Sequence, residues 1–328
     1  MVPYGGVIID RNNMGDVIMR ALLRATNFCC CVLFGVAAQA QDTVNAVEAF
    51  ERFGVDVDTT EIRIETVAPG LHVLFGAGGN VVVSIGDQGV LIVDDQFPAM
   101  VPRIRAAIQE LSGGDVDFVI NTHWHFDHAD GNPLLGKGGS WIVSQVNSRR
   151  MMTESQLINL VDVIVDQPPY PAEGLPVITF EDRMQFHFNG EQIDLLHFGP
   201  AHTTGDAAVV FRGHNVVHMG DTFFHKGYPF IDADNGGDLD GLIVFCEAVL
   251  KEIVEDTVVI PGHGPVAKYA DLAEYVSMLG TIRKRIAALI AEGATLDEVI
   301  AAKPTAEWDE VNGDPSLLLD RAFASMTR

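Results

Sequence analysis

Cysteine is scarce in this chain of 328 residues, and most of it is confined to one place. Three of the four cysteines, Cys29, Cys30 and Cys31, lie inside a single apolar run near the start. If that run is removed as part of a leader, Cys246 is left alone, and a protein with one cysteine has no internal disulfide. The folded chain must therefore be stabilised without covalent cross-links.

Basic residues are also few. The sequence has 21 Lys and Arg against 45 Asp and Glu, which gives a formal net charge of -24. A surface with this excess of acid repels phosphate backbones, so the composition argues against nucleic-acid binding. It also disfavours adhesion to anionic lipid, and it carries no positive information about a substrate.

No apolar run near the start is long enough for a permanent membrane helix, because residues 28–38 are too few to cross a bilayer. This run follows a short basic segment at residues 19–24 and precedes a small-x-small pattern, Ala-Gln-Ala, at residues 38–40. We therefore expect residues 1–40 to be a leader, made of an upstream extension and a signal peptide cleaved after Ala40. The mature protein is then expected to be periplasmic or secreted, without a membrane anchor.

The remaining chain is expected to contain an N-terminal tail at residues 41–60 and one domain at residues 61–328. Within the tail, residues 44–53 are expected to form a short helix or to stay irregular. No linker-like shift in composition separates the two halves of that domain. Alternation of β-branched residues between turns predicts strands at 62–67, 71–75, 80–85, 89–94, 116–120, 141–144, 177–180, 183–188, 192–197, 207–211, 215–219 and 257–260. Helical spacing predicts helices at 101–111, 146–165, 238–254, 271–292 and 296–302. Two β-rich halves that each end in helices favour two packed sheets with helices outside.

The most informative stretch follows directly after the predicted strand 116–120. It reads Asn-Thr-His-Trp-His-Phe-Asp-His and places four metal-capable side chains within six residues. An extended exit from the strand points His123, His125 and Asp127 to one side, and His128 follows where the chain can turn into a helix. This mixed nitrogen and oxygen set suits zinc best. The alternative is a loop of four solvated polar residues, which the complete spacing argues against.

Three later positions repeat the arrangement of a strand followed by a metal-capable residue. They are His202, Asp221 and His263, each in a glycine-containing segment just past a predicted strand. Alone, each would more often be a structural or surface residue. Their recurrence after the first cluster indicates one shared site at a strand-end rim, where glycine lets the backbone approach a metal closely.

Together these motifs resemble the metallo-β-lactamase superfamily of dinuclear hydrolases. They span residues 123–263, and the surrounding elements are consistent with its α+β fold, an αβ/βα four-layer sandwich of two mixed sheets flanked by helices. The resemblance implies two zinc ions, the first held by His123, His125 and His202, the second by Asp127, His128 and His263, with Asp221 bridging both. It also implies that Asp127 and His128 are catalytic, and that Asp127 orients the nucleophile and later moves a proton.

The chemistry that this resemblance implies is hydrolysis of a small molecule. Water shared by two divalent cations is acidic enough to supply a hydroxide that attacks a carbonyl. We expect a cyclic amide or ester, and specifically a β-lactam, since Asn235 resembles the asparagine loop of the lactamase pocket and Lys226 could receive a substrate carboxylate. Their alternative interpretations are a tight turn and a surface lysine. Export also fits lactam degradation better than hydrolysis of a cytosolic thioester.

The sequence is also compatible with other activities. The best-known lactamases carry a cysteine where this chain has Asp221, and an aspartate resembles glyoxalase II and lactonases instead. A lactonase, a thioesterase, a phosphodiesterase and a mononuclear iron oxygenase such as a persulfide dioxygenase are therefore alternatives. A ligand-binding protein on the same scaffold would be expected to have lost metal ligands, and none is lost. The oligomeric state is left open.

Residues beside the ligands are expected to orient them. The candidates are Asp94 or Asp95, at the end of a predicted strand, together with Thr122 and Asp130. Ordinary capping of loops is the alternative role for all of them. The two aromatic residues at the x positions of the histidine motif are expected to point away from the metals, where one can form a pocket wall.

Overall fold

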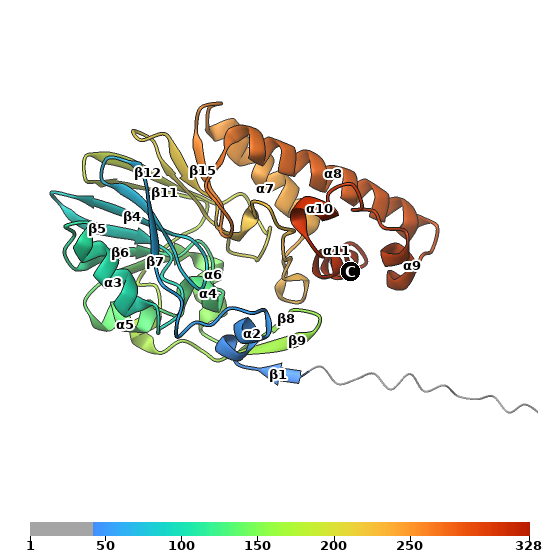
Figure 1. Cartoon of the computed structure of the whole chain (residues 1–328), viewed down its shortest axis with the longest axis horizontal. Helices are drawn as coiled ribbons and strands as arrows, with labels where there is room; N and C mark the ends of the chain where they lie inside the picture. The colour runs from blue at the N-terminus through green and yellow to red at the C-terminus, as the bar shows by residue number, and fades with distance from the viewer. Residues whose placement is uncertain (1–41) are drawn as a thin grey trace, which may run out of the picture. The chain divides into compact units, whose positions relative to one another are not determined.

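Two mixed β-sheets form the centre of the fold in the computed structural model (Figure 1). The first contains β2 (Arg63–Ala68), β3 (Leu71–Phe75), β4 (Val81–Gly86), β5 (Gly89–Val93), β6 (Val116–Ile120), β7 (Trp141–Gln145) and β10 (Ile178–Phe180). Its strand order is β10-β7-β6-β5-β4-β3-β2, antiparallel from β2 to β5 and parallel from β5 to β10. The second contains β11 (Arg183–Phe188), β12 (Glu191–Leu196), β13 (Ala208–Phe211), β14 (Val216–His218), β15 (Val258–Ile260) and β16 (Ala267–Lys268), paired in chain order. Its one parallel pair among these described strands is β14 with β15.

Alternation along the strands divides the apolar residues between two cores. In β5, Leu91 and Val93 face the other sheet, whereas Val90 and Ile92 face the helices of the first half. Because successive side chains of a strand point to opposite faces, a strand that is apolar at every position must be covered on both sides. The result is helix, sheet, sheet, helix, so the expected α+β four-layer sandwich is confirmed.

Helices cover the outer face of each sheet. Figure 1 shows α3 (Val101–Glu110) and α5 (Asn132–Lys137) beside the first sheet, and α7 (Leu239–Glu252) and α8 (Tyr269–Ala291) beside the second. The buried residues of α7 recur every three or four positions and include Cys246, which is a free thiol. The remaining helices are α2 (Ala46–Arg52), α4 (Phe126–Ala129), α6 (Val146–Met152), α9 (Leu296–Ala301), α10 (Asp309–Asn312) and α11 (Ser316–Met326).

The predicted helix at 146–165 is wrong beyond its first two turns. After α6 the chain forms a hairpin of β8 (Gln156–Asn159) and β9 (Val163–Gln167), and β1 (Asp42–Val44) pairs with β9 in parallel. Val163 and Val165 are buried and alternate with exposed or half-buried residues, which is the period of a strand. The hairpin pairing of β8 with β9 and the pairing of β9 with the distant β1 both use this extended conformation.

The structure describes residues 42–328, which belong to one unit of the chain. The leader expected at residues 1–40 lies outside them. Within the described part, no helix combines the length and apolar character needed to cross a membrane.

Candidate metal centre

The metal-capable residues singled out in the sequence meet at one end of the two sheets. His123 and His125 lie in the loop after β6, and Asp127 and His128 lie in α4. His202 follows β12, and His263 follows β15. Asp221 lies after β14, in the short 3₁₀ helix Gly220–Thr222. Six of the seven are buried and His263 is partly buried, so the chain removes these polar side chains from bulk water. Burial of this kind requires compensating partners.

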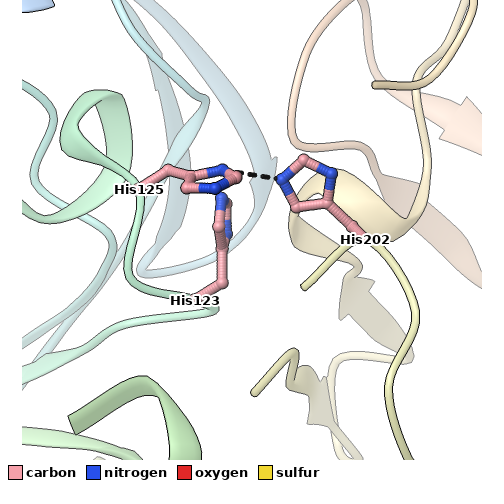
Figure 2. Close-up of side chains that lie close together, drawn as sticks. All are labelled: His123, His125 and His202. Carbon is pink, nitrogen blue, oxygen red and sulfur yellow. Dashed lines mark hydrogen bonds between the residues drawn. The ribbon is translucent and has the colours of Figure 1, made fainter. Parts of the chain in front are cut away.

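Three histidines form the first cluster (Figure 2). Nδ1 of His125 lies 2.9 Å from Nε2 of His202, and the ring of His123 packs edge-on against both. The opposite nitrogen of each facing ring is already engaged. Nε2 of His125 lies 2.9 Å from a carboxylate oxygen of Asp232, and Nδ1 of His202 lies 2.8 Å from the carbonyl oxygen of Phe230.

These partners fix the tautomers of the two rings. A carboxylate and a carbonyl only accept hydrogen bonds, so the protons sit on Nε2 of His125 and on Nδ1 of His202. In the neutral rings two lone pairs then face each other across 2.9 Å, an arrangement that repels unless a proton or a metal cation lies between them. Nε2 of His123 is buried and has no hydrogen-bond partner among the described residues.

The charge state of these imidazoles also fits a metal. Burial lowers the pKa of His202, and burial together with the neighbouring rings lowers the pKa of His123 well below its usual range. Both rings are therefore neutral, which is the form that ligates a metal. The first cluster therefore offers neutral ring nitrogens that can bind a divalent cation.

The second cluster mixes imidazoles and carboxylates. Nε2 of His263 lies 3.0 Å from Oδ2 of Asp127, and Nε2 of His128 lies 2.9 Å from Oδ1 of Asp221. The two Nε2 atoms are 3.3 Å apart. Burial alone would lower the pKa of His128, but the carboxylates around it, Asp221 first, outweigh burial and raise that pKa well above its usual range. This excess of negative charge is what a bound cation would neutralise.

Asp221 lies between the two clusters and presents one oxygen to each. Its Oδ1 is 2.9 Å from Nε2 of His128, and its Oδ2 is 3.7 Å from Nε2 of His202. Burial opposes ionisation, but His128 and His263 outweigh it and hold the pKa of Asp221 well below its usual range. Gly262 makes this approach possible, because a Cβ at that position would overlap the Asp221 carboxylate.

Two of the four residues expected to orient the ligands contact them directly. Oδ2 of Asp94 lies 2.7 Å from Nδ1 of His128 and accepts a hydrogen bond of 2.8 Å from the Thr122 hydroxyl, which in turn lies 3.0 Å from Nδ1 of His123. Asp95 instead accepts from a backbone amide, and Asp130 accepts from the Tyr170 hydroxyl. Asp94 is therefore the residue that links ligands of both clusters.

One residue of the centre, Asp232, was not predicted from the sequence. It holds Nε2 of His125, but no motif marks it, and its partner lies 107 positions away. The nearest signal was Asn235, predicted to bind substrate. The amide of Asn235 donates to both oxygens of Asp232 at 3.0 Å and to the carbonyl of Leu157 at 3.0 Å. Asn235 therefore holds Asp232 in place, and Asp232 in turn holds the ring of His125.

A cavity of about 510 Å³ opens onto the centre and is lined by His125, Asp127, Asp221 and His263. Phe126, one of the aromatic residues of the histidine motif, also lines it. Of the described residues, Lys226 and Asn235 are not among those that line this cavity. Lys226 is exposed, has a left-handed backbone with φ of 64°, and lines a separate cavity with Trp308.

Comparison with known proteins identifies a family for this chain. Residues 74–274 match the profile of a family described as the metallo-beta-lactamase superfamily. A curated protein of Methanocaldococcus jannaschii, named a probable metallo-hydrolase, is 23% identical over 199 residues, which cover 58% of this chain and 90% of that protein.

Solved structures share the fold at low identity. A metallo-beta-lactamase from Pontibacter korlensis gives a TM-score of 0.54 at 15% identity and covers 67% of this chain and 99% of its own. The DIM-1 metallo-beta-lactamase gives 0.53 at 18%, covering 67% and 98%. A variant of the sec-alkyl sulfatase PisA1 gives 0.62 at 15%, covering 81% of this chain and 50% of its own. At such identities these similarities establish the architecture, and the site itself must carry the chemistry.

Proposed function

This chain belongs to the metallo-beta-lactamase superfamily and is a metal-dependent hydrolase, and from that premise we propose that it is a dinuclear zinc enzyme that cleaves a cyclic amide or ester. The observation that carries the proposal is the position of Asp221, which offers one oxygen to each of two ligand clusters. A carboxylate placed in this way suits two ions better than one. We assign His123, His125 and His202 to the first ion, and Asp127, His128 and His263 to the second.

Two bound zinc ions would supply a Lewis acid for the carbonyl oxygen and lower the pKa of a shared water. The remaining roles fall to side chains of this protein. Asp127 lines the cavity, so its carboxylate can accept a proton from the attacking water and return it to the leaving group. His128 is fully buried and is held by Asp94, and its contribution is ligation and positioning.

The specific reaction that we propose to test first is opening of a β-lactam ring. Lactone or thioester hydrolysis is the second candidate, and one observation favours it. Among the described residues that line the cavity there is neither lysine nor arginine, so a substrate carboxylate would lack the lysine or arginine partner that the lactam interpretation expects. We also propose that the protein is exported, on the basis of the leader pattern at residues 1–40. Fractionation of cells that express the full chain would test export, with the processed protein expected in the periplasm or medium.

The experiment is a substrate panel on purified protein whose metal content has been measured. We expect two equivalents of zinc per chain and hydrolysis of a chromogenic cephalosporin that a chelator abolishes and added zinc restores. Chelator-sensitive cleavage of lactones or thioesters without any lactam turnover would move the assignment to the second candidate. One equivalent of metal in a fully active enzyme would contradict the dinuclear proposal.

A further inference from the structure

We propose that the cavity at the metal centre is a hydrophobic subsite, to which segments near the two ends of the described chain contribute, and that it binds an uncharged apolar acyl group of the substrate. This inference rests on the proposed hydrolase function and names the kind of substrate that the centre acts on. The physical basis is the chemistry of the cavity wall.

The wall is almost wholly apolar. Six of its side chains are phenylalanines, namely Phe50, Phe53, Phe75, Phe126, Phe224 and Phe230. Its polar side chains are those of the metal clusters and of Asn80, whose amide already donates to the carbonyls of Pro261 and Gly264. Away from the metal centre, a group that enters the cavity therefore meets mainly apolar side chains.

The N-terminal part of this wall comes from α2 and the residues after it. The ring of Phe50 packs edge-on against Phe97 at 4.9 Å and against Phe126 at 5.6 Å. Phe126 stands between His125 and Asp127 in the sequence, so α2 is packed directly against the metal-binding segment. Phe53 is 51% exposed, and an exposed phenylalanine beside a polar centre is available for an apolar ligand.

Another part of the wall comes from the β8–β9 hairpin and α11. Ile158 and Leu160 of the hairpin and Leu317 of α11 line the cavity. These elements are tied together through the loop that carries Asp232. Asn235 of that loop donates to the carbonyl of Leu157, and Arg321 of α11 forms an ion pair of 2.8 Å with Asp234.

The segments that contribute Phe50, Phe53 and Leu317 lie outside residues 74–274, the part that matches the superfamily. The shared part of the chain thus supplies the metal ligands and most of the apolar wall, and the flanking segments add further apolar side chains to that wall. Because Asp232 of the supporting loop also holds His125, this wall is fixed relative to the reactive centre. Such fixed surroundings favour one substrate orientation.

The chemistry of the wall specifies the occupant. Away from the metal ligands its described residues include no lysine or arginine, and the chain as a whole carries a net charge of -24, so this part of the wall offers no partner for an anionic substituent. A volume of about 510 Å³ is within the usual range for small-molecule sites. Each methylene removed from water improves binding by about fourfold, which gives a long acyl chain a large advantage here.

The test uses two matched esters, p-nitrophenyl decanoate and p-nitrophenyl butyrate, and a neutral fluorescent probe, N-phenyl-1-naphthylamine. We expect the wild-type enzyme to prefer the decanoate in kcat/KM by at least about tenfold. Phe53→Ala and Leu317→Ala should each reduce that preference by about three- to tenfold and weaken probe binding similarly. Leu157→Ala is the matched control, because Leu157 is 55% exposed, lies beside Ile158 on the hairpin, and does not line the cavity.

The outcomes separate the two proposals. If neither ester nor any lactam or lactone is cleaved, but the probe binds and the two wall variants weaken its binding, the proposed function fails and the subsite stands. If hydrolysis is efficient and chelator-sensitive but the wall variants change neither the chain-length preference nor probe binding, the subsite is overturned. Equal effects of Leu157→Ala would likewise refute a role specific to the cavity wall.

Discussion

The carboxylate of Asp94 lies 2.7 Å from Nδ1 of His128, and neither side chain is exposed to solvent. This contact directs the other nitrogen of His128, Nε2, toward Asp221. The same carboxylate accepts hydrogen bonds from both the backbone and the hydroxyl of Thr122. One buried acid therefore orients a ligand of the second cluster and the residue next to a ligand of the first.

Replacement of Asp94 should weaken metal binding. We expect Asp94→Asn to reduce metal affinity by about 10- to 100-fold, because residues that hold a ligating histidine typically contribute this much. Competition with a chromophoric chelator would measure the affinity. Asp95→Asn is the control, since Asp95 is equally buried but its hydrogen bond is to the amide of Gly131. Similar losses in both variants would contradict the specific role of Asp94.

Removal of metal should destabilise the whole fold. The proposed ligands come from the ends of several strands in both sheets, so an ion that binds them stabilises only the folded chain. At a free concentration 100-fold above Kd, each ion adds about 2.7 kcal/mol to the free energy of unfolding. Thermal unfolding with zinc and after chelation should therefore differ by several degrees. An unchanged Tm would argue that the clusters bind no metal.

Two glycine-to-alanine substitutions should differ in outcome, one impairing the metal centre and the other stabilising the fold. At Gly262 a Cβ would overlap the carboxylate of Asp221 and the backbone of Gly220, so Gly262→Ala should lower both metal content and activity. At Gly280, within α8, a Cβ meets open space. Gly280→Ala should raise the free energy of unfolding by about 0.5–1 kcal/mol, since alanine is the better helix former. Urea unfolding and metal analysis of both variants would check this pair.

Stability should depend on pH through Glu252. A hydrogen bond from Arg183, reinforced by Arg212 at 3.1 Å, lowers the pKa of Glu252 below its ordinary value of 4.5. A carboxyl whose pKa is lowered on folding contributes stability above its unfolded pKa, and that contribution is lost as pH falls through the folded pKa. Glu252→Gln should thus be less stable than wild type near neutral pH.

That difference should shrink as the pH drops below 4.5. Urea unfolding of both chains across this range measures it, and metal effects common to the two cancel. Glu255→Gln, at an exposed neighbouring position, serves as the control. A difference between wild type and Glu252→Gln that persists unchanged in acid would show that lost packing, and not charge, is responsible.

The residues of the two clusters could be proposed from sequence because the information is local. Histidine and aspartate in a tight spacing after an apolar strand restrict where their side chains can point, and later strands repeat the pattern. The fold followed in the same way from alternation and turns. The metal-capable residues did meet, as expected, at one rim of the sheets.

Other features depend on contacts between distant segments. Asp232 reaches His125 across 107 positions, and β9 pairs with β1, which lies far from it in sequence. Lys226 follows Asp221 closely in sequence. Its backbone is left-handed, and the residue lines a different cavity from the one at the metal centre. The role of Lys226 in substrate binding stays a prediction, and proximity in sequence to Asp221 does not place it in the cavity at the metal centre.

Asn80 connects the loops of the second sheet to the start of β4. Its amide donates to Pro261 and Gly264 on either side of His263, its backbone N–H donates to Gly262, and its carbonyl lies 2.8 Å from Nε2 of His218. These bonds involve no metal, so the segment that carries His263 is held in place by protein alone. Preorganisation of this kind means that an ion entering the centre spends little of its binding energy on ordering the loop, and that loading and unloading of metal can be reversible without refolding.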